Sequence, residues 1–287
     1  MTYYLSIKIL TINMKYFFLV CSILAASFSF GQEHSLVKIW ETDTLLKTPE
    51  SVLAYKHCGF LFVSNIDGGA AAKDGKGSVG KVSLDGKIIK TDWVSGLNAP
   101  KGMGILGNLL YVADLTEVVV IDIKKEKVIQ HIPVDSSTFL NDIAVDKKGI
   151  VYVSDTRTGK VHRIENGKAT TYLSKLKAPN GLLCVDDILY VLDKGSLLKV
   201  TSNKQITSLA DGMDASTDGI EMVTTDEFIV SCWAGIIYYV KADGNKQILF
   251  DNRATKINSA DIGYNAKEKI VYVPTFYGNK VVAYQLK

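Results

Sequence analysis

Four side chains that end in carboxylate or amide oxygens recur in one sequence context and together suit a hard metal ion. Glu50, Asn141, Asn180 and Asp218 each stand about ten residues before a short apolar segment. Calcium accepts roughly 6–8 such oxygens, water included. No histidine occupies an equivalent position, which argues against zinc or copper. A single Asn or Asp in this context is more often a turn residue, so it is the equivalent placement of all four that predicts a divalent cation site, with Ca²⁺ the best fit.

The context itself occurs six times, which predicts the fold. The apolar segments span residues 60–65, 110–114, 151–155, 189–193, 228–232 and 271–275. The polar residues that begin the six repeats, called lead residues from here on, advance by 51, 40, 39, 38 and 43 positions, and they are Glu50, Lys101, Asn141, Asn180, Asp218 and Asp261. A period near 40 with β-branched and aromatic strands is typical of a β-propeller with four strands in each blade. We therefore expect an all-β, six-bladed β-propeller over residues 32–287.

The third repeat shows a complete blade, and the last repeat shows how the ring closes. Strands are predicted at 143–145, 150–154, 160–164 and 169–173, separated by short turns. After Asp261 only three strands remain, so the apolar residues 37–46 are expected to be the N-terminal strand that closes the ring. A sandwich of tandem hairpins would not repeat one lead residue pattern six times.

Antiparallel strands place all six lead residues at one mouth of the central channel, together with the loops that follow each second strand. Those loops carry Trp233, Phe276 and Tyr277, which are predicted to wall a pocket; packing between blades is the alternative role for them. Lys101, Asn141 and Asp142 are predicted to contact the substrate as well. The Gly-rich residues 68–80 form either a lid or a flexible spacer on the same face.

The N-terminus has the pattern of an export signal. Lys15 precedes an apolar run over residues 16–26, and small residues follow up to Gly31. The run of about 11 residues is too short to span a bilayer, so residues 1–31 are predicted to be a signal peptide, with Met14 as a possible start. The protein is then exported, to the periplasm or the extracellular space, with no transmembrane segment. The net charge of +3 arises from 33 basic and 30 acidic residues that are well mixed, which argues against nucleic acid as a partner.

Four segments of the chain resemble the SMP-30/gluconolactonase family, which is related to the calcium-dependent six-bladed paraoxonase and diisopropyl-fluorophosphatase. They are Pro49-Glu50-Ser-Val, Asn141-Asp142 followed by Asp146-Lys-Lys-Gly149, Pro179-Asn180-Gly181-Leu182, and Asp218-Gly219-Ile220. The resemblance implies that Glu50, Asn180 and Asp218 are metal ligands, with Asn141 as an additional one. It also implies that Asp218 is the general base. The sugar lactonases of the family share an arginine where this chain has Phe139, which leaves the substrate open.

Two classes of function follow from these observations. The first is a metal-dependent hydrolase of a lactone or other ester, in which the cation polarises the carbonyl group and Asp218 activates water. The second is a non-catalytic propeller that binds a peptide, glycan or metabolite, because residues 151–161 resemble an NHL repeat. Other enzymes built on the same ring, such as a lyase or an epimerase, form a third group. Tight binding of a divalent cation by the lead residues distinguishes the first class from the second.

Overall fold

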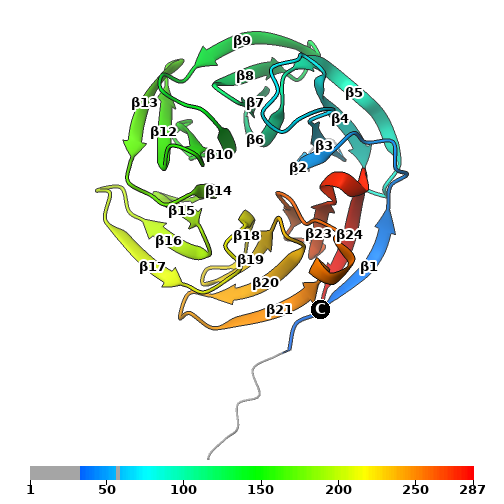
Figure 1. Cartoon of the computed structure of the whole chain (residues 1–287), viewed down its shortest axis with the longest axis vertical. Helices are drawn as coiled ribbons and strands as arrows, with labels where there is room; N and C mark the ends of the chain where they lie inside the picture. Colours follow the sequence, from blue (N-terminus) through cyan, green and yellow to red (C-terminus); the bar gives the residue numbers. More distant parts are fainter. Residues whose placement is uncertain (1–32, 56–58) are drawn as a thin grey trace, which may run out of the picture. The chain divides into compact units, whose positions relative to one another are not determined.

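The chain folds into six four-stranded antiparallel sheets around a central channel (Figure 1). The computed structural model describes residues 33–55 and 59–287, so the predicted signal peptide lies outside the described residues. Residues His34–Lys287 form one compact unit. The prediction of a six-bladed β-propeller is confirmed.

Each blade runs from an innermost strand that lines the channel to an outermost strand at the rim. In chain order the strands are β1 (Leu36–Glu41), β2 (Pro49–Tyr55), β3 (Phe60–Asn65), β4 (Gly77–Ser83), β5 (Ile88–Leu97), β6 (Pro100–Leu106), β7 (Leu109–Asp114), β8 (Glu117–Asp122), β9 (Lys127–Pro133), β10 (Leu140–Val145), β11 (Val151–Asp155), β12 (Lys160–Glu165), β13 (Lys168–Leu173), β14 (Pro179–Val185), β15 (Ile188–Asp193), β16 (Ser196–Val200), β17 (Ile206–Ala210), β18 (Thr217–Thr224), β19 (Glu227–Cys232), β20 (Ile236–Lys241), β21 (Lys246–Asp251), β22 (Gly263–Asn265), β23 (Ile270–Pro274) and β24 (Val281–Leu286). The helical segments of the described residues are two short 3-10 turns, η1 (Arg253–Thr255) and η2 (Phe276–Gly278). No helix in this part of the chain has the length and apolar character needed to cross a membrane.

The N-terminal strand closes the ring, as predicted. β1 pairs with β24 in antiparallel register, and blade six has the order β1-β24-β23-β22. The strand is shorter than the predicted 37–46 because it ends at Glu41. Leu46 follows in a turn, where it is 1% exposed and packs in the core between blades six and one.

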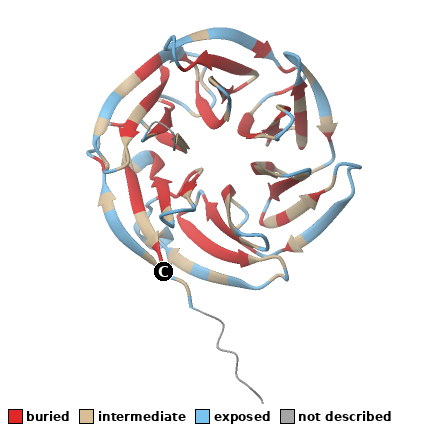
Figure 2. Ribbon diagram, turned by 180° about the vertical axis from the view of Figure 1, so that it is seen from behind, coloured by how far each residue is buried: buried red, intermediate tan, exposed pale blue. Residues whose placement is uncertain are grey.

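Six apolar clusters of the described residues lie one between each pair of neighbouring blades. A seventh, smaller cluster joins buried residues of the loops near the channel: Ile66, Ala99, Leu115, Ala260 and Phe276. Figure 2 shows buried residues on the inner and middle strands and exposed residues around the rim. Between blades one and two, for example, Phe62 and Trp93 pack against Met103 and Val112. Because each blade buries one face against each neighbour, the hydrophobic effect fixes the ring as a whole.

A β-bulge near the start of the innermost strand recurs in five blades and explains how adjacent residues can face the channel. The register of the first strand against the second shifts directly after the residue that begins each of β2, β6, β10, β14 and β18. A bulge adds one residue to one strand and redirects side chains, often beside functional sites. The lead residue of each of these blades lies inside a shifted segment.

Side chains of the second strand support these bulges. The Ser64, Ser154 and Ser231 hydroxyls accept the backbone N–H groups of Ser51, Asp142 and Gly219, each at 2.9 Å. These serines occupy the same position of the repeat, immediately before the residue that ends the strand.

In three blades, an aspartate at the end of the second strand holds the loop that leads into the first strand of the same blade. The carboxylates of Asp114, Asp155 and Asp193 each accept two backbone N–H groups from the loop that leads into the innermost strand of their blade, at distances of 2.7–3.1 Å. The strand-ending polar residue of the repeat is therefore structural in these blades.

Candidate metal and substrate site

Five of the six predicted lead residues meet at one mouth of the channel. A cavity of ≈ 230 Å³, called the mouth cavity from here on, is lined by Glu50, Lys101, Asn141, Asn180 and Asp218, which come from blades one to five in order. Its other walls are Ile66, Ala70, Phe139, Trp233, Phe276 and Tyr277. The structure thus brings together the four predicted metal ligands, Lys101 and the three predicted aromatic residues, and it adds Phe139.

Two of the predicted ligands carry buried oxygen atoms that accept no hydrogen bond from the described residues. These atoms are Oε2 of Glu50 and Oδ1 of Asn180. The other end of the Asn180 amide is engaged, because Nδ2 donates to Oδ1 of Asp218 at 2.8 Å. A buried acceptor without a donor costs about 1–3 kcal/mol, and a bound cation would remove that cost. These acceptors fit a hard cation.

Asn141 is oriented by its own blade. Its Nδ2 donates to Oγ1 of Thr156 at 3.1 Å, and the Thr156 hydroxyl in turn donates to the carbonyl of Pro179 at 2.8 Å. The threonine lies in the loop after β11 and so connects the innermost strands of blades three and four. Because the Asn141 amide donates to this threonine, its carbonyl oxygen is available as a ligand.

Lys101 is a buried cation in the same cavity, with a side chain that is 1% exposed. Its ammonium donates to the carbonyl oxygens of Ala70 at 2.9 Å and Ala99 at 3.0 Å. It also lies 4.7 Å from the centroid of the Phe139 ring. Burial lowers the pKa of Lys101, and the neighbouring carboxylates, Glu50 first, raise it again.

The site carboxyls are held in a medium that disfavours their charge. Burial raises the pKa of Glu50 well above its usual range, and nearby Asp218 raises it further, while Lys101 lowers it. Burial is also the largest cause of the strongly raised pKa of Asp218; Asp261 adds to it, and the hydrogen bond from Asn180 opposes it. With Glu50, Asp218 and Lys101 all ionised, the cavity carries a net charge of about −1. A buried charge of this kind requires compensation, which a divalent cation would supply.

The candidate site contains few charged metal ligands and no histidine or cysteine of the described residues, and this limits which metal ions fit. Among residues 33–55 and 59–287, no three His, Cys, Asp or Glu side chains gather so that they could hold a metal ion. The candidate site has two carboxylates, and its remaining donors are amides. That chemistry matches a hard, oxygen-binding ion such as Ca²⁺, which uses amide oxygens and water readily.

Asp142 does not lie in this cavity, in contrast to the prediction that it contacts the substrate. Its two carboxylate oxygens accept the N–H groups of Ile143 and Leu182, each at 2.6 Å. It lines a second cavity of ≈ 190 Å³ further along the channel. The bulge turns Asn141 and Asp142 toward different cavities, and Asp142 joins blades three and four.

Asp261 does not reach the mouth cavity, so the lead residue predicted for blade six was wrong by one position. It forms a parallel bridge with Ser51, the residue after the lead residue of blade one, and its Oδ2 accepts the Ser51 hydroxyl at 2.5 Å. Both residues line the second cavity. Ala260 therefore occupies the lead position of blade six, and this lead position provides no polar side chain to the candidate site.

The aromatic wall is a connected group over blades five and six. The ring centroids of Trp233 and Phe276 are 5.5 Å apart, and those of Phe276 and Tyr277 are 4.7 Å apart. Trp233 is 38% exposed and Tyr277 is 69% exposed, so part of this apolar surface faces solvent at the mouth. Phe276 is buried and has a φ of 49°, a left-handed conformation that is uncommon for a large side chain.

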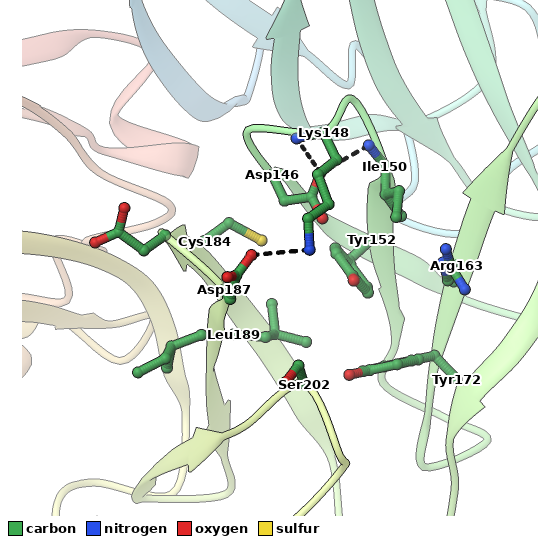
Figure 3. Close-up of a pocket in the computed structure, with 12 residues that line it drawn as sticks. Asp146, Lys148, Ile150, Tyr152, Arg163, Tyr172, Cys184, Asp187, Leu189 and Ser202 are labelled. Atoms are coloured by element: carbon green, nitrogen blue, oxygen red, sulfur yellow. Dashed lines mark hydrogen bonds and ion pairs between the residues drawn. The ribbon is translucent and has the colours of Figure 1, made fainter.

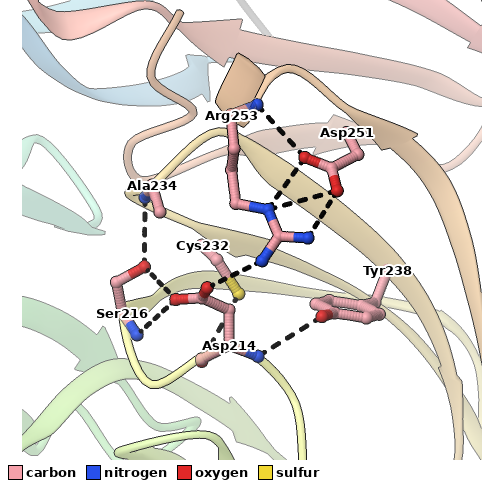
Figure 4. Close-up of polar contacts among 7 residues, drawn as sticks. All are labelled: Asp214, Ser216, Cys232, Ala234, Tyr238, Asp251 and Arg253. Carbon is pink, nitrogen blue, oxygen red and sulfur yellow. Dashed lines mark hydrogen bonds and ion pairs between the residues drawn. The ribbon is translucent and has the colours of Figure 1, made fainter. Parts of the chain in front are cut away.

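A polar network holds the loops beside Trp233 (Figure 4). The Asp214 carboxylate accepts the backbone N–H of Ser216 at 3.0 Å and its hydroxyl at 2.7 Å, and the Ser216 hydroxyl accepts the N–H of Ala234 at 3.0 Å. Arg253 connects this network to Asp251 and to Asp214. The loops before Asp218 and around Trp233 are therefore joined to each other.

The Gly-rich loop of blade one contributes backbone to the site. Its last residues, 77–80, belong to β4, so the loop is shorter than predicted. Ala70 lines the cavity and supplies the carbonyl oxygen that accepts Lys101, while Lys73 donates to the hydroxyl of Thr116 in blade two at 2.9 Å. The sequence gives no signal for the contact between Ala70 and Lys101.

Another cavity, of ≈ 160 Å³, lies between blades three and four near the turn after β10 (Figure 3). Lys148 pairs with Asp187 there at 3.0 Å, and Asp146 accepts the backbone N–H groups of its own turn. Burial raises the pKa of Cys184 to about 12, so this thiol is protonated and a poor nucleophile at neutral pH. Lys148 and Asp187 neutralise each other and Arg163 pairs with Glu165 at 3.0 Å, so this cavity has less to offer a reaction than the mouth cavity.

Comparisons with known proteins support the fold alone. No protein-family model matches the chain, and no curated protein matches it significantly. A solved streptogramin B lyase is similar with a TM-score of 0.64 and 13% identity, over 89% of this chain and 98% of its own. A catalytically inactive virginiamycin B lyase from Staphylococcus aureus with quinupristin gives 0.62 and 14%, over 88% and 99%. The extracellular domain of a hybrid two-component system from B. thetaiotaomicron gives 0.52 and 16%, over 83% of this chain and 34% of that chain.

Proposed function

We propose that this protein is an exported, divalent-cation-dependent hydrolase of the SMP-30/gluconolactonase type, which acts on a lactone or another ester. The observation that carries the proposal is the pair of buried, undonated oxygens, Oε2 of Glu50 and Oδ1 of Asn180, in one cavity with Asp218 and Asn141. These four residues come from four different blades, so the fold itself brings them together. Ca²⁺ is the ion that best matches carboxylate and amide donors.

Glu50, Asn141, Asn180 and Asp218 would hold the cation. When bound, the ion supplies Lewis-acid polarisation of the ester carbonyl and stabilises the negative charge that develops on its oxygen. Asp218 accepts a proton from the attacking water. The amide of Asn180 donates to Oδ1 of Asp218 and so fixes the direction of the carboxylate.

The walls of the cavity bind and orient the rest of the substrate. Phe139, Trp233 and Phe276 present apolar surface and displace water from the reacting group. Lys101, fixed by two carbonyl groups, adds positive charge on the side of blade two. A small substrate with an apolar portion fits these surroundings better than a polyol.

The lyases among the structural neighbours do not suggest a competing site here. One of them is inactivated by replacement of a histidine with alanine. No histidine of the described residues lines the mouth cavity of this chain. A binding propeller without turnover stays the second candidate, and a screen for hydrolysis separates it from a hydrolase.

The test is a screen of aryl and alkyl esters and lactones with Ca²⁺ and with EDTA. The proposal predicts hydrolysis that requires the cation and that falls by at least about 100-fold in Asp218→Asn. Hydrolysis that is equal in Ca²⁺ and EDTA would contradict the cation dependence. A cation that binds without any turnover would favour the binding propeller.

Export is the remaining part of the proposal. Residues 1–31 carry the signal-peptide pattern, and N-terminal sequencing of the exported protein is expected to begin at Gln32. An exported protein that still begins at Met1 or Met14 would contradict a cleaved signal.

A further inference from the structure

Arg157 presents an unpaired guanidinium at the edge of the mouth cavity. It lies in the loop between β11 and β12 and is exposed. Its Cζ is 4.4 Å from the centroid of the Phe139 ring, and Phe139 lines the cavity. Within the described part of the chain, the Arg157 guanidinium has no ion pair and no hydrogen bond; besides this stacking it feels the charge of Lys101, which repels it. Arg253, in blade five, is by contrast paired with Asp251 and Asp214.

The loop that carries Arg157 is fixed on both sides. Thr156 donates its backbone N–H to the carbonyl of Phe139 at 3.1 Å, and Gly159 donates to the carbonyl of Asp155 at 3.1 Å. The Thr156 hydroxyl also receives the amide of Asn141, one of the candidate metal ligands. The loop backbone is therefore held close to the site, and the stacking on Phe139 restrains the guanidinium, so less conformational entropy is lost when it binds a ligand.

A stacked guanidinium keeps its hydrogen-bond donors free for an anion. Arginine has five N–H donors in a planar fork that matches a carboxylate in a bidentate arrangement. Stacking on Phe139 occupies the face of the fork and leaves its edge available. Arg157 is exposed, so a negatively charged group of a ligand can reach this edge from solvent at the rim of the mouth cavity.

We propose that Arg157 recognises a carboxylate on the substrate, so that the substrate class is an ester or lactone whose apolar body carries a carboxylate group. The ester part of this inference rests on the proposed hydrolase function, whereas recognition of the anion does not. In this arrangement the carboxylate contacts Arg157 and the apolar body lies along Phe139 and Trp233. The reacting carbonyl then faces the candidate metal ligands.

The test compares two isosteric esters, para-acetoxybenzoate and para-acetoxybenzamide, with Ca²⁺ present. Arg157→Ala is expected to raise KM for the carboxylate by about tenfold, because a charge-assisted contact is lost, and to leave KM for the amide unchanged. Arg157→Lys should give an intermediate KM, since an ammonium keeps the charge but not the bidentate fork. Lys194→Ala removes an exposed charge from the equivalent loop of blade four and should leave both KM values unchanged.

Binding of benzoate and benzamide, measured by calorimetry in the same variants, separates this inference from the hydrolase function. If the protein binds benzoate in preference to benzamide and Arg157→Ala abolishes that preference, anion recognition is supported, whether or not the esters are hydrolysed. Absence of hydrolysis of both esters would contradict the hydrolase function but not this inference. Hydrolysis of both esters with equal KM, unchanged by Arg157→Ala, would overturn the inference and leave the hydrolase standing. Equal loss of both substrates in Arg157→Ala would also overturn it, because it would show that the residue only supports Phe139.

Discussion

Asn180 and Asp218 are joined across the boundary of blades four and five by a hydrogen bond of 2.8 Å from Nδ2 to Oδ1. This donation fixes the amide, so Oδ1 of Asn180 is the atom left buried without a donor. The pair thus directs one carboxylate and one amide oxygen into the same cavity. A cation ligated by the amide oxygen would leave the hydrogen bond intact.

Replacing the amide with a carboxylate tests whether Asn180 is a ligand. Asn180→Asp places two like charges beside each other, so it should destabilise the cation-free protein at pH 8. It also adds a charged ligand, so the rise in Tm on addition of Ca²⁺ should exceed that of the unaltered protein. The measurement is thermal unfolding in EDTA and in Ca²⁺.

Asn98→Asp is the matched control for that change. Asn98 donates its side-chain amide to Asp114 at 3.3 Å in blade two, outside the mouth cavity. This variant should lose stability in both buffers with no greater response to Ca²⁺. A larger Ca²⁺ response in Asn98→Asp than in Asn180→Asp would contradict the assignment.

Substitutions of two channel acids should have different effects: we expect Asp142→Asn to reduce stability and Asp218→Asn to reduce hydrolysis. Asp142→Asn removes an acceptor from the N–H of Leu182 or Ile143, and a buried donor left without an acceptor costs about 1–3 kcal/mol of unfolding free energy. Asp218→Asn should change stability by less than this while it abolishes hydrolysis. Urea unfolding measures the free energy of unfolding of each variant, and steady-state kinetics measure its kcat. Loss of hydrolysis in Asp142→Asn at unchanged stability would contradict the structural role of Asp142.

The buried carboxyls predict that the cation-free protein loses stability as pH rises. Burial raises the pKa of Asp261 to about 7, against a value of 3.8 for the exposed group, while its hydrogen bond to Ser51 lowers it. The folded state then binds more protons than the unfolded state across this window, so the free energy of unfolding falls as pH rises from about 4 to 7. The raised pKa values of Glu50, Asp142 and Asp218 act in the same direction.

Tm measured in EDTA across this pH range should therefore decline on the alkaline side by on the order of 5 °C or more. Asp261→Asn removes one titrating group and should make the profile flatter. A profile that rises from pH 5 to pH 8, or one that Asp261→Asn leaves unchanged, would contradict burial as the dominant influence on these groups.

Gly181 allows the innermost strands of blades four and five to approach each other. A Cβ at this position would overlap the backbone oxygen of Asp218 and would lie 2.9 Å from Cδ1 of Leu192. Gly181→Ala must therefore displace the Asp218 backbone, and we expect a loss of about 1–3 kcal/mol in unfolding free energy together with weaker Ca²⁺ binding. In Gly69→Ala the new Cβ would meet only the Cβ of Ala72, at 3.5 Å, so this control should be nearly neutral. Unchanged Ca²⁺ binding in a folded Gly181→Ala protein would count against a site at Asp218.

The ring and most of the lead residues could be predicted because both follow from local patterns at a fixed spacing. Strand two of each blade is a short apolar run, and the lead residue stands about ten residues before it, so counting along the chain locates one end of every blade. Closure by the N-terminal strand followed from a missing fourth strand in the last repeat.

The exceptions come from the bulges and from long-range contacts. A bulge changes which of two adjacent residues faces a given cavity, and the sequence does not show where the register shifts. This is why the sequence pattern places Asp142 at the mouth of the channel although it lines the second cavity. In blade six, where β22 shows no such shift, the pattern selects Asp261 because it is the polar residue next to Ala260, which holds the lead position. The contact between Ala70 and Lys101 uses a backbone carbonyl, which any residue would supply.

Thermal unfolding in EDTA and in Ca²⁺, for the unaltered protein and for Glu50→Gln, tests the central claim that the lead residues form a cation site. Glu50→Gln keeps the shape of the side chain and removes the charge that the cation needs. We predict that Ca²⁺ raises the Tm of the unaltered protein, by mass action on the folded state, and that Glu50→Gln abolishes the rise. Identical Tm values in EDTA and Ca²⁺, or an equal rise in both proteins, would contradict the account.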